Sequence, residues 1–326
     1  MKERSIAFDI VKGFAIFLVI FGHLTNAGEP QRILIFSFHM PLFMLVAGYF
    51  FKPLPVSGIL KKAFGRYLLI AYSTLFLDIL LQFTLYGRWA NFPTGQEWLQ
   101  TVFLYRGLWL NIPIWFVFTL TLCQVLCTVT NKMSYKAVLA LVVAFILFNE
   151  YGQKPIVWWV NSTLYAFPFF GIGFLLKKCG KAKKVLARPN IFVTVLLVAT
   201  YVGLSFWNGY TDMYTLTKGK SFVAFLYTGI TGTLLMIWLS KYVADKHRSI
   251  GKAIAFLGTK TFPILITHYY FCRIFLPKIL RYFEREGLGQ NIVFQLVVSC
   301  LLIEIYYAIF RVYERRSQSG KRQISG

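Results

Sequence analysis

The stretch that decides the fold is RSIAFDIVKGFAIFLVIFGH at residues 4–23, followed by FSFHMPLFMLVAGYFF at residues 36–51. Each run is close to the length that a helix needs to cross a bilayer. The first run also carries four ionisable side chains, those of Arg4, Asp9, Lys12 and His23. Ionisable groups in membrane segments are costly, and by default they indicate a functional site that faces the bundle interior or a water-filled cavity.

The composition of the whole chain is that of a membrane protein. Hydrophobic residues make up 57% of the 326 residues and charged residues only 14%, whereas a soluble domain is about one-quarter charged. Apolar runs of membrane-spanning length recur along the chain. We therefore predict an all-α fold, a polytopic membrane helix bundle.

Hydropathy predicts about ten transmembrane helices. They are placed near residues 6–25, 33–51, 66–86, 112–130, 135–149, 158–176, 191–207, 221–240, 254–276 and 291–312. Glycine and proline residues separate them. We see no internal repeat and no room for an appended soluble domain. We therefore expect a single transmembrane domain over residues 1–326, in which 313–326 form a short basic cytoplasmic tail.

The formal net charge of +23 reflects topology. Lysine and arginine residues gather in alternate loops, at 52–66, 132–136, 177–188, 241–252 and 315–322. The loop after the ninth predicted span breaks this pattern with four basic residues, Arg273, Lys278, Arg281 and Arg285, which Glu284 and Glu286 partly offset. The positive-inside rule then predicts that both termini are cytoplasmic. We interpret these loops as setting orientation and attracting anionic lipid, and we expect no nucleic-acid partner. The sharper alternative is that some of them bind an anionic cytoplasmic cofactor.

The predicted topology sorts the ionisable residues by depth. Asp9 and Lys12 fall near the cytoplasmic side, while His23, His39 and His268 fall toward the outer side on three different helices. One such histidine can be a hydrogen-bonded packing residue, but three at one level favour a shared cavity. Imidazole suits proton transfer near neutral pH. No carboxylate accompanies these histidines at ligand spacing, so we expect no metal site.

The two opening stretches resemble the acyltransferase 3 family of integral membrane acyltransferases. Later motifs that match in the same order are IWF at 114–116, FPFFGIG at 167–173, LGTKT at 257–261 and ITHY at 266–269. The resemblance covers almost the whole chain. The compact form is most similar to the stand-alone, fucose 4-O-acetylase-like branch.

The resemblance assigns roles to particular residues. The family's first-span motif, a basic residue, ten residues and an essential histidine, corresponds to Lys12 and His23. Many members have arginine at the first position, whereas lysine offers phosphate only a point charge. His39 matches the histidine before Met-Pro-Leu-Phe, Arg66 matches an arginine at the head of the third span, and His268 matches a late histidine.

The resemblance implies transfer of an acyl group, usually acetyl, from an acyl-CoA to a carbohydrate hydroxyl. Acetyl-CoA would be a donor substrate, and no permanently bound cofactor is expected. The acceptor would be a glycan or a lipid-linked sugar that becomes a cell-surface or secreted carbohydrate. We expect a bacterial cytoplasmic membrane as the location, and polysaccharide assembly machinery as a partner.

The expected chemistry divides the site residues between two ends. Asp9, Lys12 and Arg66 are predicted at the donor end. His23 is predicted to act as general base on the sugar hydroxyl. His39 or His268 is expected to donate to the developing oxyanion or to orient His23. A covalent acyl-histidine route stays open.

Two aromatic residues are candidates for acceptor binding. Trp115 lies in a family motif near the predicted outer mouth, and Tyr269 follows the late histidine. The other tryptophans are interpreted as interfacial anchors, since tryptophan collects at membrane boundaries.

A polysaccharide exporter or a proton-coupled transporter is the alternative function. Intramembrane histidine, aspartate and lysine would suit either. Transporters often contain repeated halves with interrupted helices, and no such repeat is visible here. The enzyme is therefore favoured.

Overall fold

The computed structural model describes residues 6–25, 28–69, 73, 80, 113, 115–152, 157–180 and 182–324. This part of the chain is helical nearly throughout, which confirms the all-α prediction. The one β-type pairing within it is an isolated bridge between Asp212 and Thr217. Two compact units are formed, one by residues 1–26 with 239–326 and the other by residues 27–238.

The first unit is built around the N-terminal helix. Its elements are α1 (Ile6–Leu24), the end of α12 (Phe222–Lys246), α13 (Arg248–Gly258), α14 (Thr261–Tyr270), η3 (Phe271–Phe275), α15 (Leu276–Tyr282), η4 (Glu286–Gln290) and α16 (Ile292–Ile324). α1 packs against α13, α14 and α16. The core between α1 and α13 includes Ile10, Val243 and Ala255.

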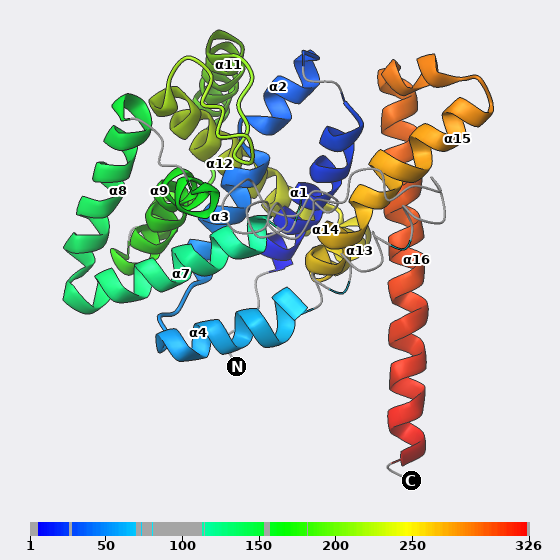
Figure 1. The fold of residues 1–326 in the computed structure, drawn as a ribbon, viewed down its shortest axis with the longest axis horizontal. Helices are drawn as coiled ribbons and strands as arrows, with labels where there is room; N and C mark the ends of the chain where they lie inside the picture. The colour runs from blue at the N-terminus through cyan, green and yellow to red at the C-terminus, as the bar shows by residue number, and fades with distance from the viewer. Residues whose placement is uncertain are drawn as a thin grey trace. The chain divides into compact units, whose positions relative to one another are not determined.

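α16 is one uninterrupted helix, drawn from orange to red in Figure 1. Its 33 residues correspond to a length of about 50 Å, which exceeds the roughly 30 Å of hydrocarbon in a bilayer. The stretch expected as a basic tail, 313–326, is part of this helix as far as Ile324.

The span predicted at 254–276 is not one straight helix. α13 and α14 meet at an angle of 73°, with Thr259 and Lys260 between them. Gly258, the last residue of α13, lies directly against α1, because a Cβ atom there would overlap the carbonyl oxygen of Asp9. A Cβ atom on Gly13 would likewise overlap the carbonyl oxygen of Ile254. Two glycines thus let the backbones of α1 and α13 touch at the bend.

The second unit is arranged around α9. Its elements are α2 (Pro30–Phe36), α3 (His39–Phe50), α4 (Val56–Lys62), η1 (Ala63–Leu68), α7 (Trp115–Met133), α8 (Tyr135–Tyr151), α9 (Trp158–Lys178), α10 (Ala182–Val185), α11 (Ile191–Asn208) and α12 up to Trp238. α9 packs against α3, α7 and α8. α8 starts at a serine cap, in which the Ser134 side chain accepts a hydrogen bond from the amide of Lys136.

Close packing of α3 on α9 also depends on glycine. A Cβ atom on Gly48 would overlap the carbonyl oxygen of Phe170, and one on Gly173 would overlap the carbonyl oxygen of Leu45. Small residues at such crossings let membrane helices approach closely enough for extensive van der Waals contact. This crossing holds α3, and with it His39, in the second unit.

Seven helices in the described part of the chain are long and apolar enough to cross a membrane, or eight if the bent α13–α14 pair counts as one span. The fifth predicted span corresponds to α8, which has only 17 residues. The third, at 66–86, lies largely outside the described residues. The count of ten, the cytoplasmic termini and the single domain stay predictions.

Replacement of Gly173 by alanine should destabilise the protein, because the new methyl group meets backbone atoms of α3 that cannot rotate away. Overpacking of this kind costs roughly 1–3 kcal/mol. Gly203→Ala on α11 is the matched control, since a Cβ atom there meets nothing within 4 Å. Thermal unfolding of the detergent-purified variants measures the effect, and equal unfolding temperatures for both would contradict the packing described here.

Candidate active site

Two histidine rings lie side by side in the first unit. His23 is in the last turn of α1 and His268 is on α14, and their ring centroids are 5.1 Å apart at an interplanar angle of 45°. Tyr269 meets the His23 ring edge-on, with centroids 5.5 Å apart at 89°. The structure thus brings together three residues that the sequence predicted as site residues on two separate helices.

His268 has a defined tautomer in its neutral form. Its Nδ1 lies 3.0 Å from the carbonyl oxygen of Ile264. Because a carbonyl oxygen can only accept, Nδ1 carries the proton and the lone pair remains on Nε2. This Nε2 atom is buried and has no hydrogen-bond partner among the described residues. Buried polar atoms are normally paired, so a buried imidazole acceptor beside His23 indicates a site for a donor.

The charged end of α1 is well separated from the histidine end. Asp9 is buried, and its Oδ1 lies 2.7 Å from Nζ of Lys12. Lys12 and His23 are eleven residues apart on one continuous helix, a rise of about 16 Å. The predicted donor residues and the predicted base therefore occupy different levels of the same helix.

His39 lies in the second unit. It begins α3 and is buried, with Nδ1 2.8 Å from the carbonyl oxygen of Ile35 and its ring 4.7 Å from that of Phe36. As in His268, the backbone carbonyl fixes the proton on Nδ1. A cavity shared by His39 and the other two histidines stays a prediction.

Trp115 and Arg66 also belong to the second unit. Trp115 begins α7 and is buried, with its ring centroid 6.2 Å from that of Tyr214. Arg66 lies in the π-helical turn η1, and its side chain is outside the described residues. Acceptor binding by Trp115 and donor binding by Arg66 stay predictions.

A polar cluster in the second unit was not predicted as a site. The Arg32 guanidinium lies over the rings of Phe36 and Tyr210, at 4.4 and 5.4 Å, and donates to the Tyr210 hydroxyl at 3.2 Å. That hydroxyl donates to Asp212 at 3.1 Å. Burial raises the pKa of the Asp212 carboxyl, and burial together with this carboxylate raises the pKa of Tyr210 to about 12. In the sequence, Arg32 stood out only as the basic residue of the loop after the first predicted span.

Known proteins identify the family. The acyltransferase domain family matches residues 5–311. A nodulation protein NolL from Mesorhizobium japonicum is 29% identical over 232 residues, which are 65% of this chain and 59% of that protein. The chain therefore aligns with less than two thirds of that relative's length. A nodulation protein NolL from Sinorhizobium fredii is 39% identical over 75 residues, 20% of this chain and 19% of that protein. No solved structure matches.

The contact with Ile264 predicts that neutral His268 is protonated on Nδ1. The ¹⁵N resonances of labelled histidine in the membrane-reconstituted protein should show a protonated Nδ1 and an unprotonated Nε2 for this residue. The His268→Gln variant, which loses the signals, provides the assignment. A neutral ring with its proton on Nε2 would contradict the geometry.

Proposed function

The chain belongs to the acyltransferase 3 family, and from this membership we propose that it moves an acetyl group from acetyl-CoA to a hydroxyl of a cell-surface or secreted carbohydrate. The observation that supports this proposal most directly is the pairing of His23 with His268 inside a membrane helix bundle. One imidazole can remove the proton of a hydroxyl while the second imidazole accepts a hydrogen bond from the first.

In the proposed reaction, His23 removes the proton of the sugar hydroxyl as the oxygen attacks the thioester carbonyl. The C–S bond breaks, the CoA thiolate leaves, and the proton on His23 neutralises it. The products are the sugar ester and free CoA. Metal ions and permanently bound cofactors have no part in this scheme.

His268 would orient the base. A centroid separation of 5.1 Å allows the nitrogen atoms of two imidazoles to approach hydrogen-bond distance. His268 Nε2 would then accept the N–H of His23 and direct the other nitrogen of His23, with its lone pair, toward the sugar hydroxyl. In many enzymes a catalytic base is held in one tautomer in this way, by a hydrogen bond to a neighbouring side chain. The edge-on ring of Tyr269 would restrict rotation of His23.

Donor and acceptor would meet this pair from different directions. Lys12, held by Asp9, and Arg66 are proposed to contact the phosphates of acetyl-CoA from the cytoplasmic side. The acceptor, a glycan or lipid-linked sugar, is proposed to arrive from the outer side and to stack on Trp115 or Tyr269. Location in a bacterial cytoplasmic membrane, with polysaccharide assembly machinery nearby, belongs to the same proposal.

Replacement of His23 by alanine should reduce acyl transfer by about 10²–10⁴-fold, the usual contribution of a general base. His247→Ala is the matched control, because this histidine is exposed at the start of α13. Transfer of label from [¹⁴C]acetyl-CoA to glycan in reconstituted vesicles measures the rate. Wild-type transfer by an inserted His23→Ala protein would exclude His23 as the base. Glycan movement without label transfer would favour the exporter.

Replacement of Arg66 by alanine should weaken acetyl-CoA binding in low salt. The difference between the variant and the wild type should shrink as salt rises, because salt screens contacts between arginine and phosphate. Titration of acetyl-CoA at low and high ionic strength measures both effects, and Arg188→Ala, in another basic loop, is the control. Unchanged donor affinity in Arg66→Ala would place the phosphates elsewhere.

A further inference from the structure

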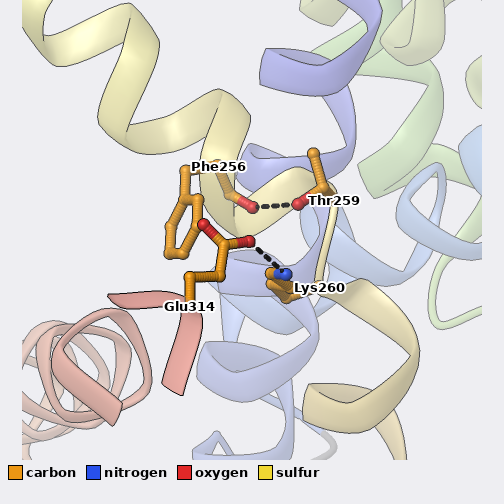
Figure 2. Close-up of polar contacts among 4 residues, drawn as sticks. All are labelled: Phe256, Thr259, Lys260 and Glu314. Atoms are coloured by element: carbon orange, nitrogen blue, oxygen red, sulfur yellow. Dashed lines mark hydrogen bonds and ion pairs between the residues drawn. The ribbon is translucent and has the colours of Figure 1, made fainter. Parts of the chain in front are cut away.

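α14, which carries His268, is attached to α16 at two points. Lys260, at the start of α14, places Nζ 2.6 Å from Oε1 of Glu314 (Figure 2). Farther along α14, the Thr267 hydroxyl lies 2.7 Å from the Tyr306 hydroxyl. The two attachments are seven residues apart on α14 and eight residues apart, in the opposite direction, on α16. Two antiparallel helices with a rise of 1.5 Å per residue keep such a register.

The donor in the second attachment can be assigned. The Thr267 hydroxyl donates its single proton to the carbonyl oxygen of Pro263, at 2.7 Å. The Tyr306 hydroxyl must therefore be the donor to Thr267. Removal of the Tyr306 hydroxyl leaves the bond of Thr267 within α14 intact and breaks only the link to α16.

The bend between α13 and α14 also packs against α16. The hydroxyl of Thr259 donates to the carbonyl oxygen of Phe256 at 2.7 Å, which closes the end of α13 (Figure 2). The Phe256 ring packs edge-on against Tyr307 at 5.4 Å and lies under the Arg311 guanidinium at 4.9 Å. The end of α13 and the start of α14 thus share one surface of α16.

We propose that the Lys260–Glu314 and Thr267–Tyr306 pairs form a positioning brace that fixes His268 opposite His23. Thr267 directly precedes His268, so its bond to Tyr306 sets the rotation of α14 where the imidazole emerges. Lys260 sets the height of the helix after the 73° bend. The catalytic consequence of the brace depends on the proposed function, whereas the geometry does not.

Stability alone does not account for the ion pair. The side chains of Lys260 and Glu314 are 24% and 36% exposed, and ion pairs of this exposure contribute little to folding. Catalysis is far more sensitive, because a misplacement of about 1 Å can reduce a rate by about a hundredfold. The brace variants should therefore insert and fold while turnover falls.

Two neighbouring phenols provide a matched comparison. Tyr306→Phe should reduce kcat by about tenfold and leave the KM for acetyl-CoA within about twofold, because the donor end of α1 is untouched. Tyr307→Phe removes a hydroxyl that accepts from Arg311 at 3.2 Å, and should leave kcat unchanged. Lys260→Glu and Glu314→Lys should each reduce kcat, and the double variant should restore most of it.

A proximity measurement separates this proposal from the proposed function. In a background without the five native cysteines, His23→Cys and His268→Cys are joined by a short membrane-permeant bismaleimide. Tyr306→Phe should lower the yield of crosslinked protein and Tyr307→Phe should not, whatever His23→Ala does to turnover. Equal yields in the two phenylalanine variants, or a double charge swap that fails to restore kcat, would overturn the brace.

Discussion

The contact on which the site depends is the one between the backbones of α1 and α13. Gly258 meets the carbonyl oxygen of Asp9, and Gly13 meets that of Ile254, with no space for a Cβ atom at either position. This contact seats the bend of the broken span against α1 near its charged end. α14 then continues along α1 and brings His268 to His23, in the last turn of α1.

The buried polar groups near the two ends of α1 differ in whether they have a partner. The Asp9 carboxylate is buried but paired with Lys12, an arrangement that limits the cost of a buried charge. His268 satisfies one nitrogen with a backbone carbonyl and leaves the other buried without a partner among the described residues. A histidine that served only packing would be expected to satisfy both. The proposed role of His268 beside His23 uses this unpaired nitrogen.

Several helices and the residues of the histidine pair could be predicted from the sequence. Long, mainly apolar runs predicted α1, α9 and α11, and family motifs singled out His23, His268 and Tyr269. The bend at Thr259 and Lys260 could not be predicted, because hydropathy averages over a window and carries no information about which glycine meets which backbone. The links to α16 join residues 54 and 39 positions apart, so no local periodicity reveals them.

The separation of Lys12 and His23 along α1 matches the length of the proposed donor. Acetyl-CoA carries its phosphates at one end and its thioester at the tip of a long flexible arm. A helix that presents Lys12 at one level and His23 about 16 Å away can bind the charged end of such a molecule while its reactive end reaches the base. A compact donor such as acetyl phosphate could not occupy both levels. If Lys12 and His23 act as proposed, the distance between them along α1 requires a long acyl carrier, and the proposed brace between α14 and α16 places His268 at the reactive end of that carrier.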